Sequence, residues 1–285
     1  MNINLSLTPL VFLTPLVFLV LLLITLFSTD IVLGADTSDR NKPVMQKEYE
    51  MRLKQYSEAA EQGDAQAQIN LGMIYERKQD FELAKSWYAK AARQGNAEAQ
   101  FLYARRHTGR NRLDELKKAA EMGSPQGQYE YALTALQFKA IDRNEQFQWM
   151  LKAADNNVTE AQYWVATAYL HDGMSREEKE AGDIPLDEKA AFRWFLRLAE
   201  TGVDEPYRER KTEAQSRVGW MYYQGRGVRQ DYAKAFHWFT KAAESKNYGG
   251  YMGLAAMYRN GHFVKQDIKK AEEWASKAKP APVSY

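Results

Sequence analysis

Small and polar positions recur along the chain in an order that predicts pairs of helices. In five copies, Ala or Gly is followed directly by Gln, and a small residue comes five positions later. In the first copy, Ala67, Leu71 and Tyr75 are four residues apart and would form one stripe along a helix. The copies start at Ala67, Ala99, Gly127, Ala161, Ala214 and, in a weaker copy without Gln, Gly250. The small residues are Gly72, Ala104, Ala132, Ala166, Gly219 and Ala255.

The other half of each repeat predicts a second helix, whose pattern is typified by the stretch HWFTKAA. In this helix Ala235, Trp238 and Ala242 share one face. The corresponding tryptophans are Trp87, Trp149, Trp194, Trp238 and Trp274, and the predicted helix stops are Gly95, Gly123, Asn157, Gly202 and Asn247. We expect the small residues, including Gly72 and Gly219, to have a structural role, because they let two helices approach closely. The tryptophans would fill the space beneath the next pair.

The repeats predict an all-α solenoid, because one helix pair cannot bury its apolar face alone whereas stacked pairs can. Their starts are 32, 28, 34, 53 and 36 residues apart. We expect the solenoid to occupy 47–279, as a capping helix and about six helix pairs, followed by a tail at 280–285. Two charge-rich insertions, 174–184 and 203–213, cause the long spacing. They are either solvated surface loops or a side wall for a partner.

The most complete copy lies at residues 214–243, where small residues, Tyr222, the stretch GRGV, Trp238 and KAA occur in order. This pattern resembles the Sel-1-like repeat family, relatives of the tetratricopeptide repeats, and the resemblance covers about 47–278. It implies a right-handed α-solenoid of stacked helix-turn-helix repeats. The GRGV glycines would form the turn between two helices. A dinucleotide-binding loop would need a preceding strand and a third glycine.

The N-terminal segment 1–35 predicts export. Residues 10–28 form a run without charge. This run is longer than the apolar core of most signal peptides and close to the length of a membrane helix. Pro15 interrupts the run, and VLGA at 32–35 offers small residues for cleavage, so a cleaved signal peptide is favoured over an uncleaved anchor. A linker at 36–46 would follow. Either alternative makes the protein periplasmic or secreted, with possible inner-membrane anchoring only through this segment.

Composition excludes several kinds of chemistry. The chain has no cysteine, which rules out disulfides and zinc–thiolate sites. Its four histidines lack metal-binding spacing, and no G-x-S-x-G motif occurs. His107 occupies a Tyr position and is interpreted as a core histidine. Without residues 1–35 the net charge is +3, from 39 Lys and Arg and 36 Asp and Glu, which is too small to indicate nucleic-acid binding. We therefore expect no metal, no cofactor and no enzymatic activity. The alternative is an envelope hydrolase acting on glycan or lipid, which would need a carboxylate pair that only folding could assemble.

The predicted binding surface follows by analogy with tetratricopeptide stacks, in which the first helix of each pair lines the concave groove. The candidate partner-binding residues are Asn70, Met73, Arg105, Glu130, Leu133, Trp164, Thr167, Arg217, Trp220 and Tyr223. Trp164 and Trp220 stand out because tryptophan is enriched in interface hot spots. The alternative for both is packing between repeats.

The resemblance implies that the partner is another protein. Sel-1-like proteins are generally adaptors, and some exported members are immunity proteins that neutralise lipase-type toxins. We therefore expect either an immunity protein that binds a secreted toxic effector or an adaptor that binds an envelope component.

Overall fold

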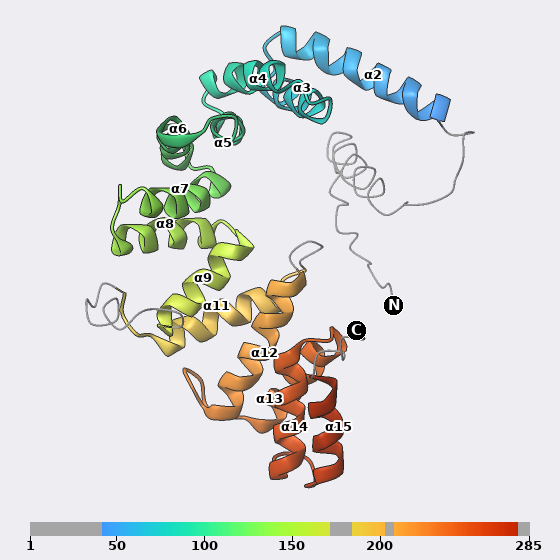
Figure 1. Ribbon diagram of the computed structural model, residues 1–285, viewed down its shortest axis with the longest axis vertical. Coiled ribbons are helices and arrows are strands. Elements are labelled where there is room, and N and C mark those ends of the chain that lie inside the picture. Colours follow the sequence, from blue (N-terminus) through green and yellow to red (C-terminus); the bar gives the residue numbers. More distant parts are fainter. Residues whose placement is uncertain (1–41, 172–183, 203–207, 279–285) are drawn as a thin grey trace, which may run out of the picture. The chain divides into compact units, whose positions relative to one another are not determined.

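The computed structural model describes residues 42–171, 184–202 and 208–278, drawn as coloured ribbon in Figure 1. The chain divides into two units, residues 1–55 and 56–285. Helix α2 (Lys42–Glu61) begins in the first unit, within the segment predicted as a linker. The predicted export segment and the tail at 280–285 lie outside the described residues, as does nearly all of the first predicted insertion.

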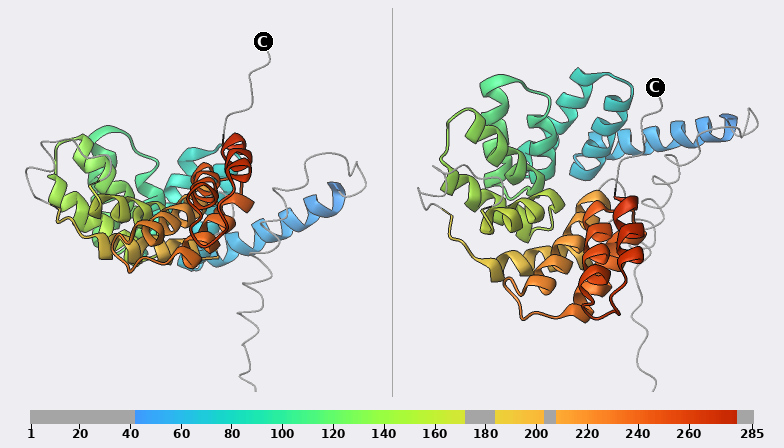
Figure 2. Two further views of the ribbon diagram at one scale, coloured as in Figure 1. Left: turned by 90° about the horizontal axis from the view of Figure 1, so that it is seen from below. Right: turned by 60° about the horizontal axis from the view of Figure 1, so that its bottom comes forward.

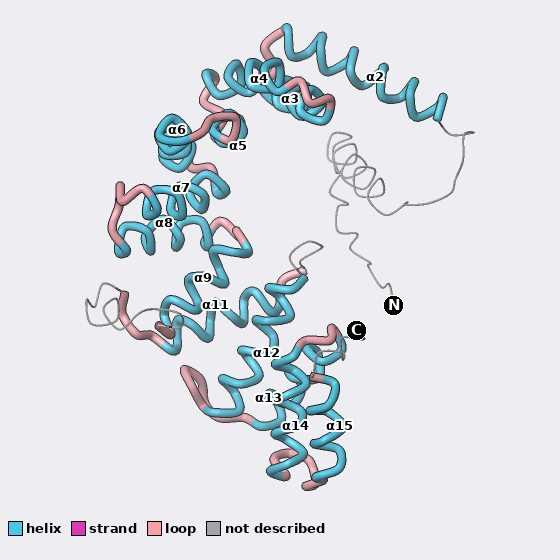
Figure 3. The backbone as a smooth tube through the Cα atoms, in the orientation of Figure 1, coloured by secondary structure: helices cyan, strands magenta, loops and turns pink. Residues whose placement is uncertain are grey.

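The second unit is all-α in its described residues, which contain twelve further helices and no strand (Figure 3). In chain order they are α3 (Ala65–Arg77) and α4 (Phe81–Arg93), α5 (Ala97–Ala104) and α6 (Gly109–Glu121), α7 (Pro125–Gln137) and α8 (Arg143–Asp155), α9 (Thr159–Tyr169) and α11 (Glu188–Glu200), α12 (Arg208–Gln224) and α13 (Tyr232–Glu244), and α14 (Tyr248–Asn260) and α15 (Ile268–Lys277). From α3 onward each helix packs against the next, and consecutive helices lie side by side in both views of Figure 2. The predicted α-solenoid of stacked pairs is confirmed.

The links between pairs combine a left-handed residue with a helix cap. Gly95 has a φ of +85°, and the following Asn96 accepts a hydrogen bond at 2.9 Å from the backbone N–H of Ala99. Glycine adopts this conformation without the steric cost of a Cβ. The stops predicted at Gly123 and Asn157 also have positive φ, whereas Gly202 does not. The stop predicted at Asn247 is wrong by one residue, because Lys246 has the positive φ of +59° and Asn247 caps α14.

The small residue of each first helix is buried where the two helices of a pair touch. A Cβ added to Gly72 would lie 2.5 Å from the ring of Tyr88, and one added to Gly219 would lie 2.6 Å from the ring of Phe239. The alanines at this position are at most 1% exposed, namely Ala104, Ala132, Ala166 and Ala255. The predicted close approach is therefore confirmed, since a ring occupies the volume that a larger side chain would need.

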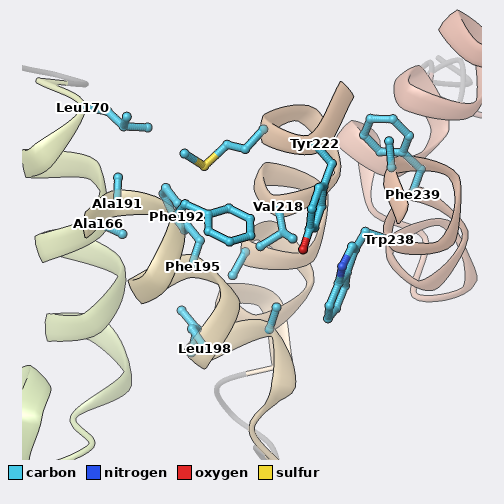
Figure 4. Close-up of a cluster of buried hydrophobic side chains, with 14 of the residues drawn as sticks. Ala166, Leu170, Ala191, Phe192, Phe195, Leu198, Val218, Tyr222, Trp238 and Phe239 are labelled. Carbon is cyan, nitrogen blue, oxygen red and sulfur yellow. The ribbon is translucent and has the colours of Figure 1, made fainter. Parts of the chain in front are cut away.

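Aromatic residues of the second helices fill the core, but the deepest position is not the predicted tryptophan. Tyr88, Phe195 and Phe239, each directly after a tryptophan, are fully buried. Of the five predicted tryptophans only Trp238 is buried. Successive helix positions are about 100° apart, so the residue after the tryptophan points more directly at the first helix. Figure 4 shows Phe195, Trp238 and Phe239 in the largest cluster, which α9, α11, α12, α13 and α14 build.

The GRGV stretch forms the predicted turn. Gly225 and Gly227 have φ of +73° and +68°, and a Cβ on Gly227 would collide with the backbone carbonyl oxygen of Glu188. The backbone conformation thus favours glycine at both positions, and the close approach to Glu188 requires it at Gly227. Of the second predicted insertion, residues 208–213 are helical and form the first turns of α12, and residues 203–207 lie outside the described residues. At the base of the first insertion, His171 Nε2 lies 2.7 Å from the carbonyl oxygen of Ile184.

Candidate protein-binding surface

Four polar and aromatic side chains line one side of α12. Glu213, Arg217, Trp220 and Gln224 are separated by four, three and four residues, so they form a single stripe along the helix, here called the α12 stripe. On the opposite side, Val218 and its neighbours are buried in the core. The helix also packs against α9 and α14, the first helices of the adjacent pairs. The α12 stripe thus lies where three successive first helices meet.

A pocket of about 320 Å³ opens beside the α12 stripe. It is lined by Leu170, Glu213, Ser216, Arg217, Trp220, Met221, Gln224, Arg226 and Gly249. Leu170 comes directly after α9, and Gly249 lies in the first turn of α14. A Cβ on Gly249 would lie 2.6 Å from Ser216 Oγ, so glycine allows α14 to approach α12 at the pocket wall. We call this feature the α12 pocket.

Charged groups of the α12 pocket are held by neighbouring repeats. The Glu213 carboxylate accepts hydrogen bonds of 3.4 Å from the Tyr163 hydroxyl, Arg217 Nε and Asn247 Nδ2. Burial, and next the Glu213 charge, raise the pKa of Tyr163, so its hydroxyl keeps its proton at neutral pH. Glu213 is therefore a satisfied acceptor that links three repeats.

On the opposite rim, Arg226 Nε donates to Glu188 Oε1 at 2.8 Å, and both side chains are more than a third exposed. This pair joins the turn after α12 to the first turn of α11. Arg226 therefore lines the α12 pocket while remaining in contact with water.

Trp220 has one side in the core and another in the pocket. Its ring makes edge contacts with Phe239 at 5.1 Å and Tyr223 at 5.5 Å between centroids. Trp164 packs against the core through Phe147, with ring centroids 6.2 Å apart. Trp164 on α9 therefore packs against the preceding pair, whereas the ring contacts of Trp220 lie within its own pair. Trp220 also lines the α12 pocket.

Tyr223 is tied into the last repeat. Its hydroxyl accepts a hydrogen bond from Asn260 Nδ2 at 2.8 Å and lies 3.0 Å from His262 Nδ1. The His262 ring stacks on Tyr232 at 4.3 Å. Tyr223 thus helps to join the fifth pair to the sixth.

The remaining predicted binding residues are spread along the earlier first helices. Glu130 pairs with Arg112 at 2.5 Å, Thr167 Oγ1 donates to the Trp164 carbonyl at 2.8 Å, and Asn70 Oδ1 accepts from Gln66 at 3.3 Å. Arg105 lies over the Phe101 ring at 5.9 Å, while Met73 and Leu133 are exposed. Of the ten predicted residues, the α12 pocket brings together Arg217 and Trp220.

Within residues 42–171, 184–202 and 208–278, no group of three or more His, Asp or Glu side chains could hold a metal ion. No helix in these ranges has both the length and the apolar character needed to cross a membrane. His107 packs edge-on against Tyr103, with ring centroids 4.7 Å apart, and burial lowers its pKa. It is only partly buried, so it lies beside the core and not within it.

The family model of the Sel1 repeat matches residues 65–96, 125–158, 159–203, 212–247 and 250–279, which together are more than half of the chain. The chain belongs to the Sel1 repeat family. Sel1 repeats generally mediate binding between proteins. The matched residues leave out 97–124, where α5 and α6 form the shortened pair.

Solved structures of Sel1 repeat proteins have the same architecture. The chain is similar to a protective antigen present in uropathogenic Escherichia coli strains, with 26% identity and a TM-score of 0.61 over 79% of this chain and 48% of that one. This chain therefore spans about half the length of that relative. It is also similar in fold to a Sel1 repeat protein from Oxalobacter formigenes, with 23% identity and a TM-score of 0.57 over 86% and 70% of the two chains. No curated protein matches.

In each matched Sel1 repeat the tryptophan of the second helix carries a cation over its ring. The pairs are Trp87–Lys90, Trp149–Lys152, Trp194–Arg197, Trp238–Lys241 and Trp274–Lys277, with distances of 3.6 to 5.2 Å from cation to ring centroid. In the shortened pair, Glu115 takes the tryptophan position and bonds Lys118 Nζ at 2.8 Å. Leu116 beside it is fully buried and fills the core. The basic residue three positions after the tryptophan thus covers a ring that is only partly buried in four of the five repeats, Trp238 being buried.

The Gln of the Sel1 repeat has a role that sequence reasoning missed. It is buried in every copy and, in four, donates to a carbonyl at the end of the preceding second helix or cap. These bonds are Gln68 to Ala60 at 3.0 Å, Gln128 to Ala120 at 3.4 Å, Gln162 to Ala154 at 3.2 Å and Gln215 to Ala199 at 3.5 Å. The carbonyl oxygens of Ala60, Ala120 and Ala154 also accept from the backbone N–H three residues later. There the Gln supplies a second donor to a helix-end carbonyl, and this bond ties it to the next first helix.

Proposed function

We propose that this protein is an exported binding protein that holds another protein against the α12 stripe. The observation that carries the proposal is the α12 pocket, in which Trp220 and Arg217 stand together on a rigid first helix. Tryptophan and arginine are the residues most enriched among interface hot spots. The Sel1 family background supports the same class of function.

The packing of Trp220 supports a binding role because it pre-organises the ring. Contacts with Phe239 and Tyr223 fix the indole before any partner arrives. Ordering a side chain on binding costs about 0.5–1.5 kcal/mol, and a ring already fixed avoids most of that cost. The fully buried Phe239 in turn rests against the glycines of α12 and α14.

We further propose that the protein acts outside the cytoplasm, because its N-terminal segment has the features of an export signal or anchor. Two partner classes follow from the family resemblance. A secreted toxic lipase-type effector would make the protein an immunity protein, and an envelope component would make it an adaptor. We propose no catalytic step for the α12 pocket.

Photo-crosslinking in cells that produce the full chain tests the binding surface. The photoreactive residue p-benzoylphenylalanine would replace Gln224, which is exposed and lines the α12 pocket. The matched control places it at Lys269, an exposed position on α15. We expect a discrete crosslinked species from position 224 only, and mass spectrometry of that species identifies which partner class is correct.

A second arm tests the tryptophan. In the Gln224 crosslinking background, Trp220→Ala should lower the crosslink yield at least about tenfold, as expected for a hot spot, whereas Trp164→Ala should not. Circular dichroism checks that each variant is folded, and Arg217→Gln replaces Trp220→Ala if the latter unfolds. Equal crosslinking from positions 224 and 269, or none from either, would contradict the proposal.

A further inference from the structure

The helix pair that contains the α12 pocket has a net positive charge. Residues 208–247 contain nine Lys and Arg and four Asp and Glu, so their net charge is +5. The whole chain has a net charge of only +2. A partner segment that approaches α12 therefore meets an excess of positive charge, which favours an acidic segment over a basic one.

The groups that face the α12 pocket can receive a carboxylate. Arg226 contacts Glu188 through Nε, and a guanidinium carries five N–H donors, so this group can take a second carboxylate from solvent. Arg217 lies on the other side, next to Glu213. Because Glu213 already accepts bonds from three protein donors, it repels an incoming carboxylate less than a carboxylate with no donors would.

The pocket also offers apolar surface to a single side chain. Trp220, Met221 and Leu170 form its apolar lining, and Gly249 adds no side chain. Its volume of about 320 Å³ is at the lower end of the range for ligand pockets, which is about 300–1,000 Å³. One apolar side chain with its flanking backbone is a suitable occupant.

We propose that the partner segment bound at the α12 pocket is acidic, with an apolar anchor side chain inserted beside Trp220 and flanking carboxylates directed at Arg226 and Arg217. This inference rests on the proposed function, since it names the chemistry of the segment that the α12 stripe binds. The anchor supplies apolar burial, and the carboxylates supply the preference for acidic over neutral or basic sequences.

Short synthetic peptides test this chemistry on the full chain. The acidic probe is acetyl-Glu-Phe-Glu-amide, and the comparison probes replace both Glu by Gln, both Glu by Lys, or Phe by Ala. Titrations are followed by the indole N–H signal of Trp220, assigned with Trp220→Phe. An exposed ion pair strengthens binding by up to about fivefold, so the acidic probe should bind about three- to tenfold more tightly than its Gln counterpart. High salt should remove this difference.

Two matched variants locate the effect. Arg226→Gln should reduce the preference for the acidic probe about two- to fivefold. Arg229→Gln removes the same charge from an exposed position outside the pocket lining and should leave the preference unchanged.

The inference is overturned if the Gln or Lys probe binds as tightly as the acidic one, if the Ala probe matches the Phe probe, or if no probe shifts the Trp220 signal. These outcomes differ from failure of the proposed function. A partner that crosslinks at position 224, with a yield indifferent to Arg226→Gln and to salt, would uphold protein binding and reject the acidic segment.

Discussion

Replacing Gly219 with Ala should destabilise the last two helix pairs strongly for so small a change. The new Cβ would lie 2.6 Å from Cδ1 of Phe239, where an ordinary carbon contact is about 3.5–4.0 Å. The Phe239 ring is fully buried, and α14 limits its movement, because a Cβ added to Gly253 would likewise collide with the ring. Overpacking of this kind lowers the free energy of unfolding by about 1–3 kcal/mol. We expect Gly219→Ala to fall in the upper half of that range, because two helices confine the Phe239 ring.

Chemical denaturation followed by circular dichroism measures the loss, and hydrogen exchange locates it. Stability in stacked repeats is roughly a sum of local terms, so faster exchange should appear in α12, α13 and α14 before α3 and α4. The control is Gly123→Ala, a glycine with no heavy atom within 4 Å of an added Cβ but with a φ of +92°. Its cost should come from backbone strain alone, about 1 kcal/mol, and should be confined to the link between α6 and α7.

A double-mutant cycle decides whether the ring is the cause. Phe239→Leu removes the aromatic edge, and its own cost is the usual one for a smaller core side chain. If the reasoning is correct, Gly219→Ala should be much less harmful in the Phe239→Leu background, with an interaction energy of at least about 1 kcal/mol. Additive costs would refute the steric explanation, because the loss would then not depend on Phe239.

Three further outcomes are expected. Lys246→Gly should raise the melting temperature by about 2–4 °C, because it removes roughly 1 kcal/mol of left-handed strain, whereas Gly95→Lys should lower it similarly. Lys152→Met should shift Trp149 fluorescence and cost about 0.5–1 kcal/mol by urea denaturation, since it removes the cation over that ring. Burial raises the pKa of Tyr88 well above 10, so the unfolded chain loses this proton first as pH rises. Stability should therefore fall above about pH 10 in alkaline titration, less steeply in Tyr88→Phe; an equal slope would exclude Tyr88 as the cause.

The repeat pattern was sufficient to predict the all-α solenoid, because its features have local steric causes. The small residues allow two helices to approach closely, and the residues at the helix stops allow the chain to turn. Gly72 faces the ring of Tyr88, 16 residues later, and Gly219 faces the ring of Phe239, 20 residues later. The separations differ, but both rings directly follow the tryptophan of the same repeat, so the repeat pattern indicates the close approach. The deepest ring was harder to predict. Tryptophan is the most conspicuous residue of the second helix, but the residue after it points more directly at the first helix, as Phe239 does.

The candidate surface was only partly predictable for a different reason. Arg217 and Trp220 were found because they stand on a first helix beside the small-residue stripe. Leu170, Arg226 and Gly249 line the same pocket but come from a helix end, a turn and the next repeat. Their convergence depends on how three first helices pack, which no single repeat specifies.

The same packing explains why the α12 pocket stays open on the side of α14. Residues of α14 that correspond to Glu213, Arg217 and Trp220 in repeat register are Gly249, Gly253 and Ala256. Two of these are glycines that let α14 lie close to Ser216 and Phe239. None of the three has a side chain long enough to cover the α12 stripe. The last first helix therefore supports α12 closely and leaves its large side chains open on one side, which is the arrangement that a binding surface requires.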